Sequence, residues 1–189
     1  LHECLRLSRL IDDLLELSRL QSGTEAMEPA KLNVTELIEE MPMRYETLAE
    51  DKGIEFTTDL MENCPYTWAN ADRVEQILTI LLDNAFKFTP PEGRVWIETQ
   101  VQNRKILVRV KNSGDGIQPE DLPHVFERFY KADKAHTGGG TGLGLSIASE
   151  ILQRMGESIS VSSVPGQTTT FSFTLPVYDA EQHKAEEQD

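Results

Sequence analysis

Apolar residues recur with helical spacing in several stretches of the chain. The pattern predicts helices over residues 72–88 and 143–155, and a further helix over residues 35–50 that Thr35 would cap. The first stretch, residues 1–21, carries a regular apolar stripe with charged residues on its other face. Its leucines follow a 3,4,3 spacing at Leu7, Leu10, Leu14 and Leu17, and Ile11 and Leu15 widen the stripe.

Alternating apolar and polar residues predict strands in the rest of the chain. Residues 93–102 and 105–112 are expected to pair as a hairpin around Asn103 and Arg104. Antiparallel strands with helices on one face make an α+β two-layer sandwich. The other predicted strands are residues 31–34, 54–60, 65–69, 158–163 and 168–177.

The same patterns divide the chain into four parts. The helix over residues 1–22 is too short to be stable alone, so we expect it to pack on a helix of a second chain or of a preceding segment. The alternative is packing on its own domain. Residues 23–30 form a short linker, residues 31–177 the main domain, and residues 178–189 an acidic tail that we expect to be disordered.

The composition is that of a soluble globular protein and disfavours binding to nucleic acid or to an anionic membrane. The chain has 189 residues, of which 39% are hydrophobic and 26% charged, which is ordinary for a soluble globular protein. The 32 acidic and 18 basic residues give a net charge of −14, which disfavours binding to nucleic acid or to an anionic membrane. A polyphosphate ligand would therefore need local compensation from a metal ion, backbone N–H groups or a few placed cations.

Cysteine usage and hydropathy indicate a cytoplasmic protein. Cys4 and Cys64 lie far apart with no C-x-x-C spacing, so neither a disulfide framework nor a zinc site is expected. No apolar run approaches the roughly 18 residues needed to span a bilayer, and no signal peptide is visible. A helical stripe already runs at the first residue without a preceding Met, so we expect a piece of a longer protein, which can itself be membrane-anchored.

Three polar or glycine-rich stretches are candidates for chemistry. In "RVKNSGDGIQPED" a predicted strand breaks into Asn112, Gly114, Gly116 and Ile117, where glycines let the backbone approach a flat or charged ligand. In "GGGTGLGLSIASEIL" the spacing differs from that of a Walker loop. Its backbone N–H groups at a helix start can meet phosphate, although a plain flexible connector is the alternative. Its candidate residues are Gly140, Thr141, Gly142, Leu143, Gly144 and Leu145.

The third stretch, "ILLDNAFKFTP", places three unlike side chains on one face of a helix end. Asn84 offers an amide oxygen suited to Mg²⁺, Lys87 a point charge for phosphate, and Phe88 a ring for a purine. Together these types suit Mg-ATP. Taken separately, each also fits an ordinary structural role, as a surface amide, a solvated charge and a core ring.

The chain resembles the ATP-binding domain of sensor histidine kinases, because four motifs follow one another in the order found there. They are Asn84, Gly114 with Gly116, residues 126–130, and the glycines at 140–144. That domain belongs to the larger family shared with gyrase, Hsp90 and MutL, and the resemblance covers about residues 31–177. It implies a Bergerat-type sandwich, a mixed sheet with helices on one face, that binds ATP and Mg²⁺. The helix over residues 1–22 is similar to the second helix of the kinase dimerisation domain.

The resemblance also implies roles for single residues. Asn84 is expected to coordinate Mg²⁺, and Phe88 to contact the adenine. Lys87, Arg128 and Lys131 are expected to meet the phosphates. Residues 130–140 are expected to form a mobile lid. The nucleotide contacts that it implies further are Asn112, Gly114, Gly116, Ile117, Phe126, Tyr130, Gly140, Thr141, Gly142, Leu143, Gly144 and Leu145.

Three departures from the family pattern qualify these expectations. The phospho-accepting His motif is not in this chain, since His2 lacks the expected Thr-Pro and lies on the wrong helix. Ile80 stands where hydrolytic relatives place a Glu that activates water, so ATP hydrolysis as the primary activity is disfavoured. Asn112 replaces the usual Asp. An amide can accept from the adenine amino group or donate to guanine, so weaker discrimination of ATP from GTP is expected.

The sequence thus predicts the catalytic part of a bacterial two-component sensor kinase. It would pass the γ-phosphoryl of ATP to a His on the dimerisation domain of the same protein, a homodimer, from which a response regulator receiver domain takes it. Two other functions stay open, an ATPase or anti-sigma-type Ser/Thr kinase of the same family and a non-enzymatic nucleotide-binding regulator.

Overall fold

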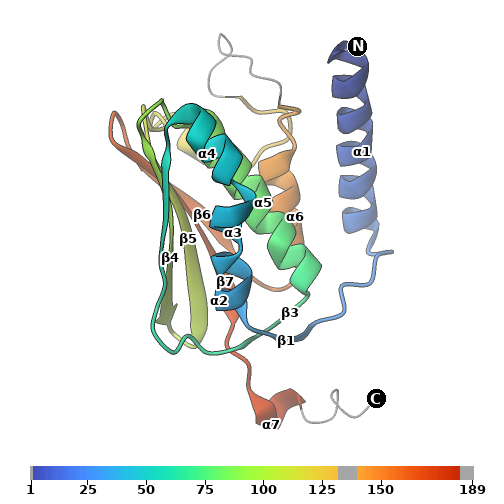
Figure 1. The fold of residues 1–189 in the computed structure, drawn as a ribbon. Helices are drawn as coiled ribbons and strands as arrows, with labels where there is room; N and C mark the ends of the chain where they lie inside the picture. Colours follow the sequence, from blue (N-terminus) through green and yellow to red (C-terminus); the bar gives the residue numbers. More distant parts are fainter. Residues whose placement is uncertain (1, 132–139, 184–189) are drawn as a thin grey trace.

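A mixed five-stranded sheet forms one layer of the protein (Figure 1). The computed structural model describes residues 2–131 and 140–183. Four strands pair antiparallel, and the edge strand β2 alone runs parallel to its neighbour β4. The strands, in their order across the sheet, are β2 (Glu55–Asp59), β4 (Arg94–Gln102), β5 (Lys105–Ser113), β7 (Thr168–Pro176) and β6 (Ile159–Val164).

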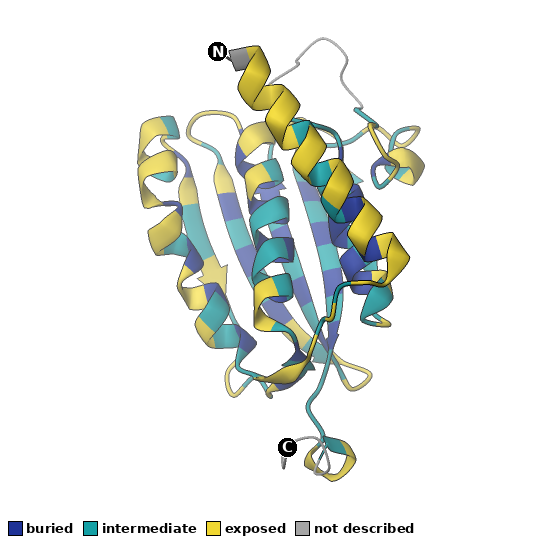
Figure 2. Ribbon diagram, turned by 90° about the vertical axis from the view of Figure 1, so that its right-hand side faces the viewer, coloured by how far each residue is buried: buried dark blue, intermediate teal, exposed yellow. Residues whose placement is uncertain are grey.

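Helices cover one face of this sheet (Figure 2). The longest of them in the sandwich is α5 (Ala71–Phe88), beside α6 (Gly144–Arg154). A small antiparallel pair, β1 (Ala30–Leu32) with β3 (Thr67–Ala69), closes the end of the layer at the N-terminus of α5. The α+β two-layer sandwich predicted from the sequence is therefore confirmed.

The core lies between α5, α6 and the inner face of the sheet. Strand residues alternate between buried and half-buried along β5, β7 and residues 95–99 of β4, as expected when one face of a sheet is covered. The fully buried residues of α5 recur at helical spacing and point toward the strands. They are Val74, Ile77, Leu78, Leu81, Leu82, Ala85 and Phe86.

The predicted hairpin turns at a tight two-residue loop. Asn103 and Arg104 both adopt positive φ, at 52° and 61°. Two successive residues with positive φ are typical of the turn whose twist matches paired strands. The hairpin predicted around these two residues is confirmed.

The long helix predicted for residues 35–50 is wrong. The chain forms three short helices instead, and Pro42 lies in the first turn of the second one. Pro lacks an N–H and its ring clashes with the preceding turn, so one continuous helix cannot pass through it. The cap residue is Asn33, whose side chain accepts from Thr35 N at 3.2 Å. The helices are α2 (Val34–Glu39), α3 (Met41–Arg44) and α4 (Glu46–Lys52).

The first helix, α1 (His2–Ser22), packs on its own domain beside α6 (Figures 1 and 2). Leu17 and Leu20 near its end are buried in the core cluster. Packing of this helix on its own domain, which was the alternative expectation from the sequence, is therefore confirmed for its last turns. The partner helix expected for the rest of the stripe stays a prediction, and the side chains exposed there are Leu7, Ile11, Leu14 and Leu15.

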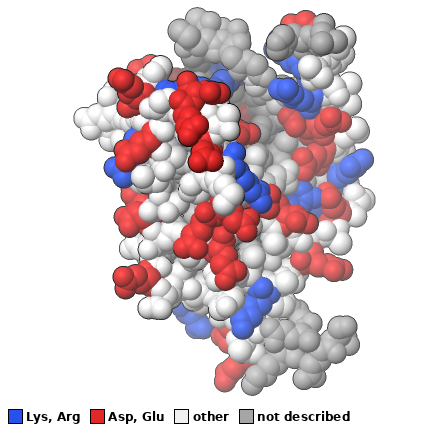
Figure 3. Space-filling view, viewed as in Figure 1, with Lys and Arg blue, Asp and Glu red and all other residues white. Residues whose placement is uncertain are grey.

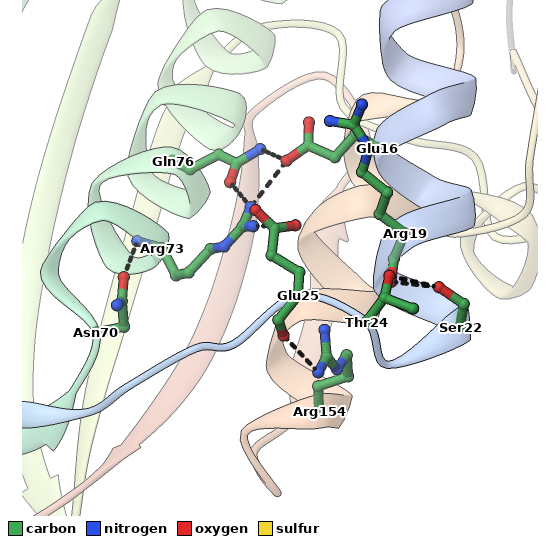
Figure 4. A network of polar contacts seen from close by, with 9 residues as sticks. All are labelled: Glu16, Arg19, Ser22, Thr24, Glu25, Asn70, Arg73, Gln76 and Arg154. Carbon is green, nitrogen blue, oxygen red and sulfur yellow. Dashed lines mark hydrogen bonds and ion pairs between the residues drawn. The ribbon is translucent and has the colours of Figure 1, made fainter.

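A polar network fixes α1 against the main domain (Figure 4). Arg73 of α5 forms ion pairs with Glu16 of α1 at 2.8 Å and with Glu25 of the linker at 2.6 Å. Gln76 donates to the same Glu16 carboxylate at 2.7 Å, and Arg154 donates to the Glu25 carbonyl at 3.0 Å. The linker and α1 thus share charged partners on two helices of the sandwich.

The start of the tail is ordered, contrary to the sequence prediction for residues 178–189. Residues Ala180–His183 form a one-turn helix, α7. The His183 ring stacks on Trp68, with ring centroids 4.3 Å apart, and this aromatic contact ties the turn to the domain. Residues 184–189 lie outside the described part of the chain. In the part that is described, no helix is long and apolar enough to cross a bilayer.

We expect Leu78→Ala to lower the free energy of unfolding by about 2–5 kcal/mol, because it leaves a cavity between α5 and the sheet. Leu48→Ala is the matched control, since Leu48 is 38% exposed on α4 whereas Leu78 is fully buried. Urea unfolding followed by circular dichroism measures both. Equal losses for the two variants would contradict the placement of α5 in the core.

Candidate functional site

Three segments far apart in the sequence meet at the C-terminal end of α5. A Cβ added to Gly114 would lie 2.7 Å from the Phe88 carbonyl oxygen, so the loop after β5 touches the last turn of α5. A Cβ added to Gly144 would lie 3.4 Å from Ile80 Cγ2, so the N-terminus of α6 also faces α5. The three stretches that the sequence singled out therefore lie together in space.

The end of α5 presents the predicted polar and aromatic group. Asn84 is half-buried, whereas Lys87 and Phe88 are exposed, and the Lys87 ammonium lies 5.1 Å from the Phe88 ring centroid. Partial desolvation and then the charge of Lys131 lower the pKa of Lys87. Two cations therefore lie close together here, and an anion bound between them would favour both charges.

Hydrogen bonds hold the last turn of α5 in place. The Thr89 hydroxyl donates to the Ala85 carbonyl at 2.6 Å, and the Lys52 ammonium donates to the Phe86 carbonyl at 2.8 Å. The Ala85 carbonyl also accepts from Thr89 N at 3.0 Å, whereas the Phe86 carbonyl lies in the last turn and has no partner within the helix. The turn that carries Lys87 is thus fixed from α4 and from the following loop, which favours a preorganised site.

Asn112, at the end of β5, is 5% exposed. Its Nδ2 donates to the Ser113 carbonyl at 3.1 Å. Among the residues that the structure describes, none donates to its Oδ1. This orientation favours an acceptor toward a ligand, which suits an adenine amino group, over the guanine-binding orientation that the sequence also allows.

The loop after Asn112 depends on two glycines in conformations that other residues rarely adopt. Gly114 has a φ of 154° and Gly116 a φ of 74°. At Gly116 a Cβ would lie 2.8 Å from Ser163 Oγ and 2.9 Å from the Val164 carbonyl oxygen. Ser163 Oγ also accepts from Ile117 N at 2.8 Å. Ser163 thus fixes this loop. No sequence pattern pointed to this residue, because it lies 46 positions from Ile117.

The glycine-rich loop before α6 is held at both sides. Gly142 accepts from Phe129 N at 2.9 Å, and a Cβ on Gly142 would lie 3.1 Å from Phe129 Cα. The Thr141 hydroxyl donates to Asp13 of α1 at 2.5 Å. Leu143 is fully buried, and no side chain within the described residues caps the N-terminus of α6. Its first N–H groups are therefore available to an anionic ligand.

The segment between these loops contributes aromatic and cationic residues. Phe126 packs edge-to-face on Phe171 of the sheet at 6.0 Å between centroids. The Tyr130 hydroxyl bonds Asp121, which raises the pKa of Tyr130 to about 12. Arg128 is exposed and Lys131 half-buried. Most of the expected lid, from 132 to 139, lies outside the described residues.

The donor set can hold a metal ion only with help from a ligand. Across residues 2–131 and 140–183, no group of three or more His, Cys, Asp or Glu is placed to hold a metal. Asn84 offers one amide oxygen, and Mg²⁺ prefers six oxygen ligands. The residues therefore fit an ion whose other ligands are phosphate oxygens and water.

The surface around this region is mostly acidic. Figure 3 shows Asp and Glu side chains spread over the helical side, with Lys and Arg placed singly among them. A phosphate-binding site in such a chain must rely on backbone N–H groups and a few cations. The uncapped start of α6 and the pair Lys87 and Lys131 supply both.

The sequence and fold resemble those of sensor kinases. Residues 69–179 match the family model "Histidine kinase-, DNA gyrase B-, and HSP90-like ATPase". The sensor protein SrrB of Staphylococcus aureus is 36% identical over 178 residues, which cover 93% of this chain but only 30% of SrrB.

Solved structures agree with the sequence comparison. Full-length ShkA in complex with AMPPNP superposes with a TM-score of 0.82 at 28% identity, over 92% of this chain and 37% of ShkA. Histidine kinase ThkA in complex with the response regulator protein TrrA has a TM-score of 0.77 at 26% identity, over 93% of this chain and 48% of that chain. Both similarities cover more of this chain than the sandwich, the linker and the tail together, so they include at least part of α1.

We expect Gly116→Ala to destabilise the protein more than Gly166→Ala. Both glycines have a positive φ, 74° and 73°, so the strained backbone destabilises both variants by roughly 1 kcal/mol. Only at Gly116 does the new methyl group meet backbone atoms, whereas nothing lies within 4 Å at Gly166. Thermal unfolding of both variants measures the difference, and equal midpoints would contradict the close packing of this loop on β6.

Proposed function

We propose that this chain, which belongs to the histidine kinase-, DNA gyrase B- and HSP90-like ATPase family, is the catalytic part of a sensor histidine kinase. Residues 31–177 would bind Mg-ATP, residues 1–22 would be the second helix of a dimerisation domain, and residues 23–30 the linker. The observation that carries the proposal is that the Gly114–Gly116 loop meets the last turn of α5 at Phe88, while Gly144 of the glycine-rich loop meets Ile80, one turn before Asn84.

The base of ATP would lie against the end of β5. Asn112 Oδ1 would accept from the adenine amino group, because Nδ2 is already bonded to Ser113. Gly114 and Gly116 would let the backbone approach the ring. Phe88 offers an exposed ring to the base. The half-buried Ile117, Phe126 and Leu145 and the fully buried Leu143 would form apolar support behind the site.

The phosphates would lie between the start of α6 and the cations at the end of α5. The N–H groups around Gly142 and Gly144, with Thr141, would donate to phosphate oxygens. Lys87, Lys131 and the exposed Arg128 would offset the phosphate charge. Mg²⁺, when bound, supplies charge neutralisation at the transferring phosphoryl group. Asn84 would hold this ion, and Gly140 and Tyr130 would border the site.

The chemistry that the residues support is transfer rather than hydrolysis. Ile80, at the position where water would be activated, packs beside Gly144, and an aliphatic side chain cannot accept a proton. Catalysis would then consist of positioning the γ-phosphoryl for a nucleophile that another domain brings. That nucleophile would be a His of the dimerisation domain, and a response regulator would take the phosphoryl from it.

The partners of the whole protein follow from the same reasoning. The exposed apolar stripe of α1 fits the helical bundle of a homodimer, as expected for a dimerisation helix. The chain would work in the cytoplasm, whether or not the longer protein is anchored in the plasma membrane.

The isolated chain is expected to bind ATP without labelling itself from γ-labelled ATP, because it lacks the acceptor His. It is expected to label a separately supplied dimerisation domain, and Asn84→Ala should abolish this transfer through loss of Mg²⁺ binding. Phosphotransfer assays with calorimetry measure both steps. Acid-labile label on the isolated chain would show that the chain does contain a phospho-accepting His. Lack of ATP binding would refute the proposed function.

Asn112→Ala is expected to weaken ATP binding by about 1 to 3 kcal/mol, because the adenine amine would be left buried without an acceptor. GTP binding should be weak in the wild type and change little in the variant. Competition titrations with the two nucleotides measure this. If GTP competes as well as ATP, the amide has turned and donates to the base, and the weaker discrimination of ATP from GTP that was expected from the sequence would hold instead.

A further inference from the structure

One hydrogen bond joins α1 directly to the glycine-rich loop. Thr141 Oγ1 donates to Asp13 Oδ2 at 2.5 Å, across 128 positions of sequence. Asp13 lies outside the part of the chain that matches the family model, residues 69–179. A carboxylate only accepts hydrogen bonds, so the single proton of the Thr141 hydroxyl is committed to Asp13 in this arrangement.

The position of Asp13 is fixed by contacts on the same helix. Glu16, one turn further on, is bonded to Arg73 and Gln76 of α5 (Figure 4). Leu17 packs in the core cluster. Asp13 is half-buried between this anchored turn and the glycine-rich loop. The carboxylate is therefore held at the loop by α1 as a whole and not by a mobile side chain alone.

A phosphate oxygen and Asp13 would compete for the Thr141 proton. To donate to a phosphate, the hydroxyl must leave a charge-assisted bond, which is stronger than a neutral one. The negative charge of Asp13 would also repel an anion at the same loop. Both effects lower the affinity of the site for nucleotide.

We propose that Asp13 is a positioning residue of the nucleotide site, which acts through Thr141 and lowers the affinity for ATP while α1 is docked. This inference rests on the proposed function, because Thr141 must face the bound phosphates. By linkage, ATP binding weakens the contact between α1 and the loop by the same factor. Nucleotide occupancy and the docking of α1 are thereby coupled.

Mg-ATP titration of the whole chain by calorimetry tests the proposal. Asp13→Ala is expected to lower the Kd for ATP about fivefold, since one hydrogen bond no longer competes. Asp12→Ala is the matched control. It removes one negative charge from the neighbouring, exposed position of the same helix, where the side chain has no hydrogen bond or ion pair to any residue that the structure describes. Its Kd should stay near that of the wild type.

A double-mutant cycle separates action through Thr141 from a general effect of α1. In a Thr141→Val background, the effect of Asp13→Ala on the Kd should fall well below fivefold, because no hydroxyl remains to be released and only the loss of the Asp13 charge acts on the ligand. Circular dichroism melting verifies that each variant is folded.

Equal Kd values for Asp13→Ala and Asp12→Ala would overturn the inference, as would a fivefold effect that persists in the Thr141→Val background. In both cases ATP still binds and the proposed function stands. Absence of ATP binding by the wild type and all variants would instead refute the proposed function itself.

Discussion

The burial of one face of α5 is the constraint on which the rest of the structure depends. Its apolar residues pack on the sheet and beside α6, so the helix can neither rotate nor slide without exposing them. Because the helix period is fixed, Asn84 and Lys87 then emerge on the side of the glycine loops. Bonds from Thr89 and Lys52 hold the last turn. The site thus obtains its geometry from the core and needs few contacts of its own.

The sequence predicted the elements whose signals are local. The helix over residues 72–88 and the hairpin at Asn103 and Arg104 follow from periodicity and turn chemistry, and both are as expected. The prediction of one helix from 35 to 50 was wrong because Pro42 interrupts an otherwise helical pattern. The prediction of a disordered tail was wrong near His183, because the stacking of this residue on Trp68 is a tertiary contact that composition cannot reveal.

The site also combines features that the sequence predicts locally with features that depend on tertiary contacts. The residue types at 84, 87, 88 and 112–116 pointed to a nucleotide, and the fold places them together. The groups that fix them did not stand out, because Ser163 and Asp13 are ordinary residues in ordinary patterns. Their roles arise only when distant segments meet, as for Ile117 with Ser163 and Thr141 with Asp13. The orientation of Asn112 likewise depends on a neighbouring carbonyl and not on its identity.

The order of the strands has a consequence for how the chain folds. The hairpin of β4 and β5 closes through two residues, and that of β6 and β7 through the short loop from Pro165 to Gln167, so both pairings are local and can form within about 1–10 μs. The pairing of β5 with β7, and the parallel pairing of β2 with β4, join strands that are distant in sequence and pay a larger loop-closure entropy. The strand that carries Asn112, β5, is therefore expected to acquire its second neighbour late. The nucleotide site therefore depends on a long-range pairing, that of β5 with β7, in which Asn112 lies opposite Thr169.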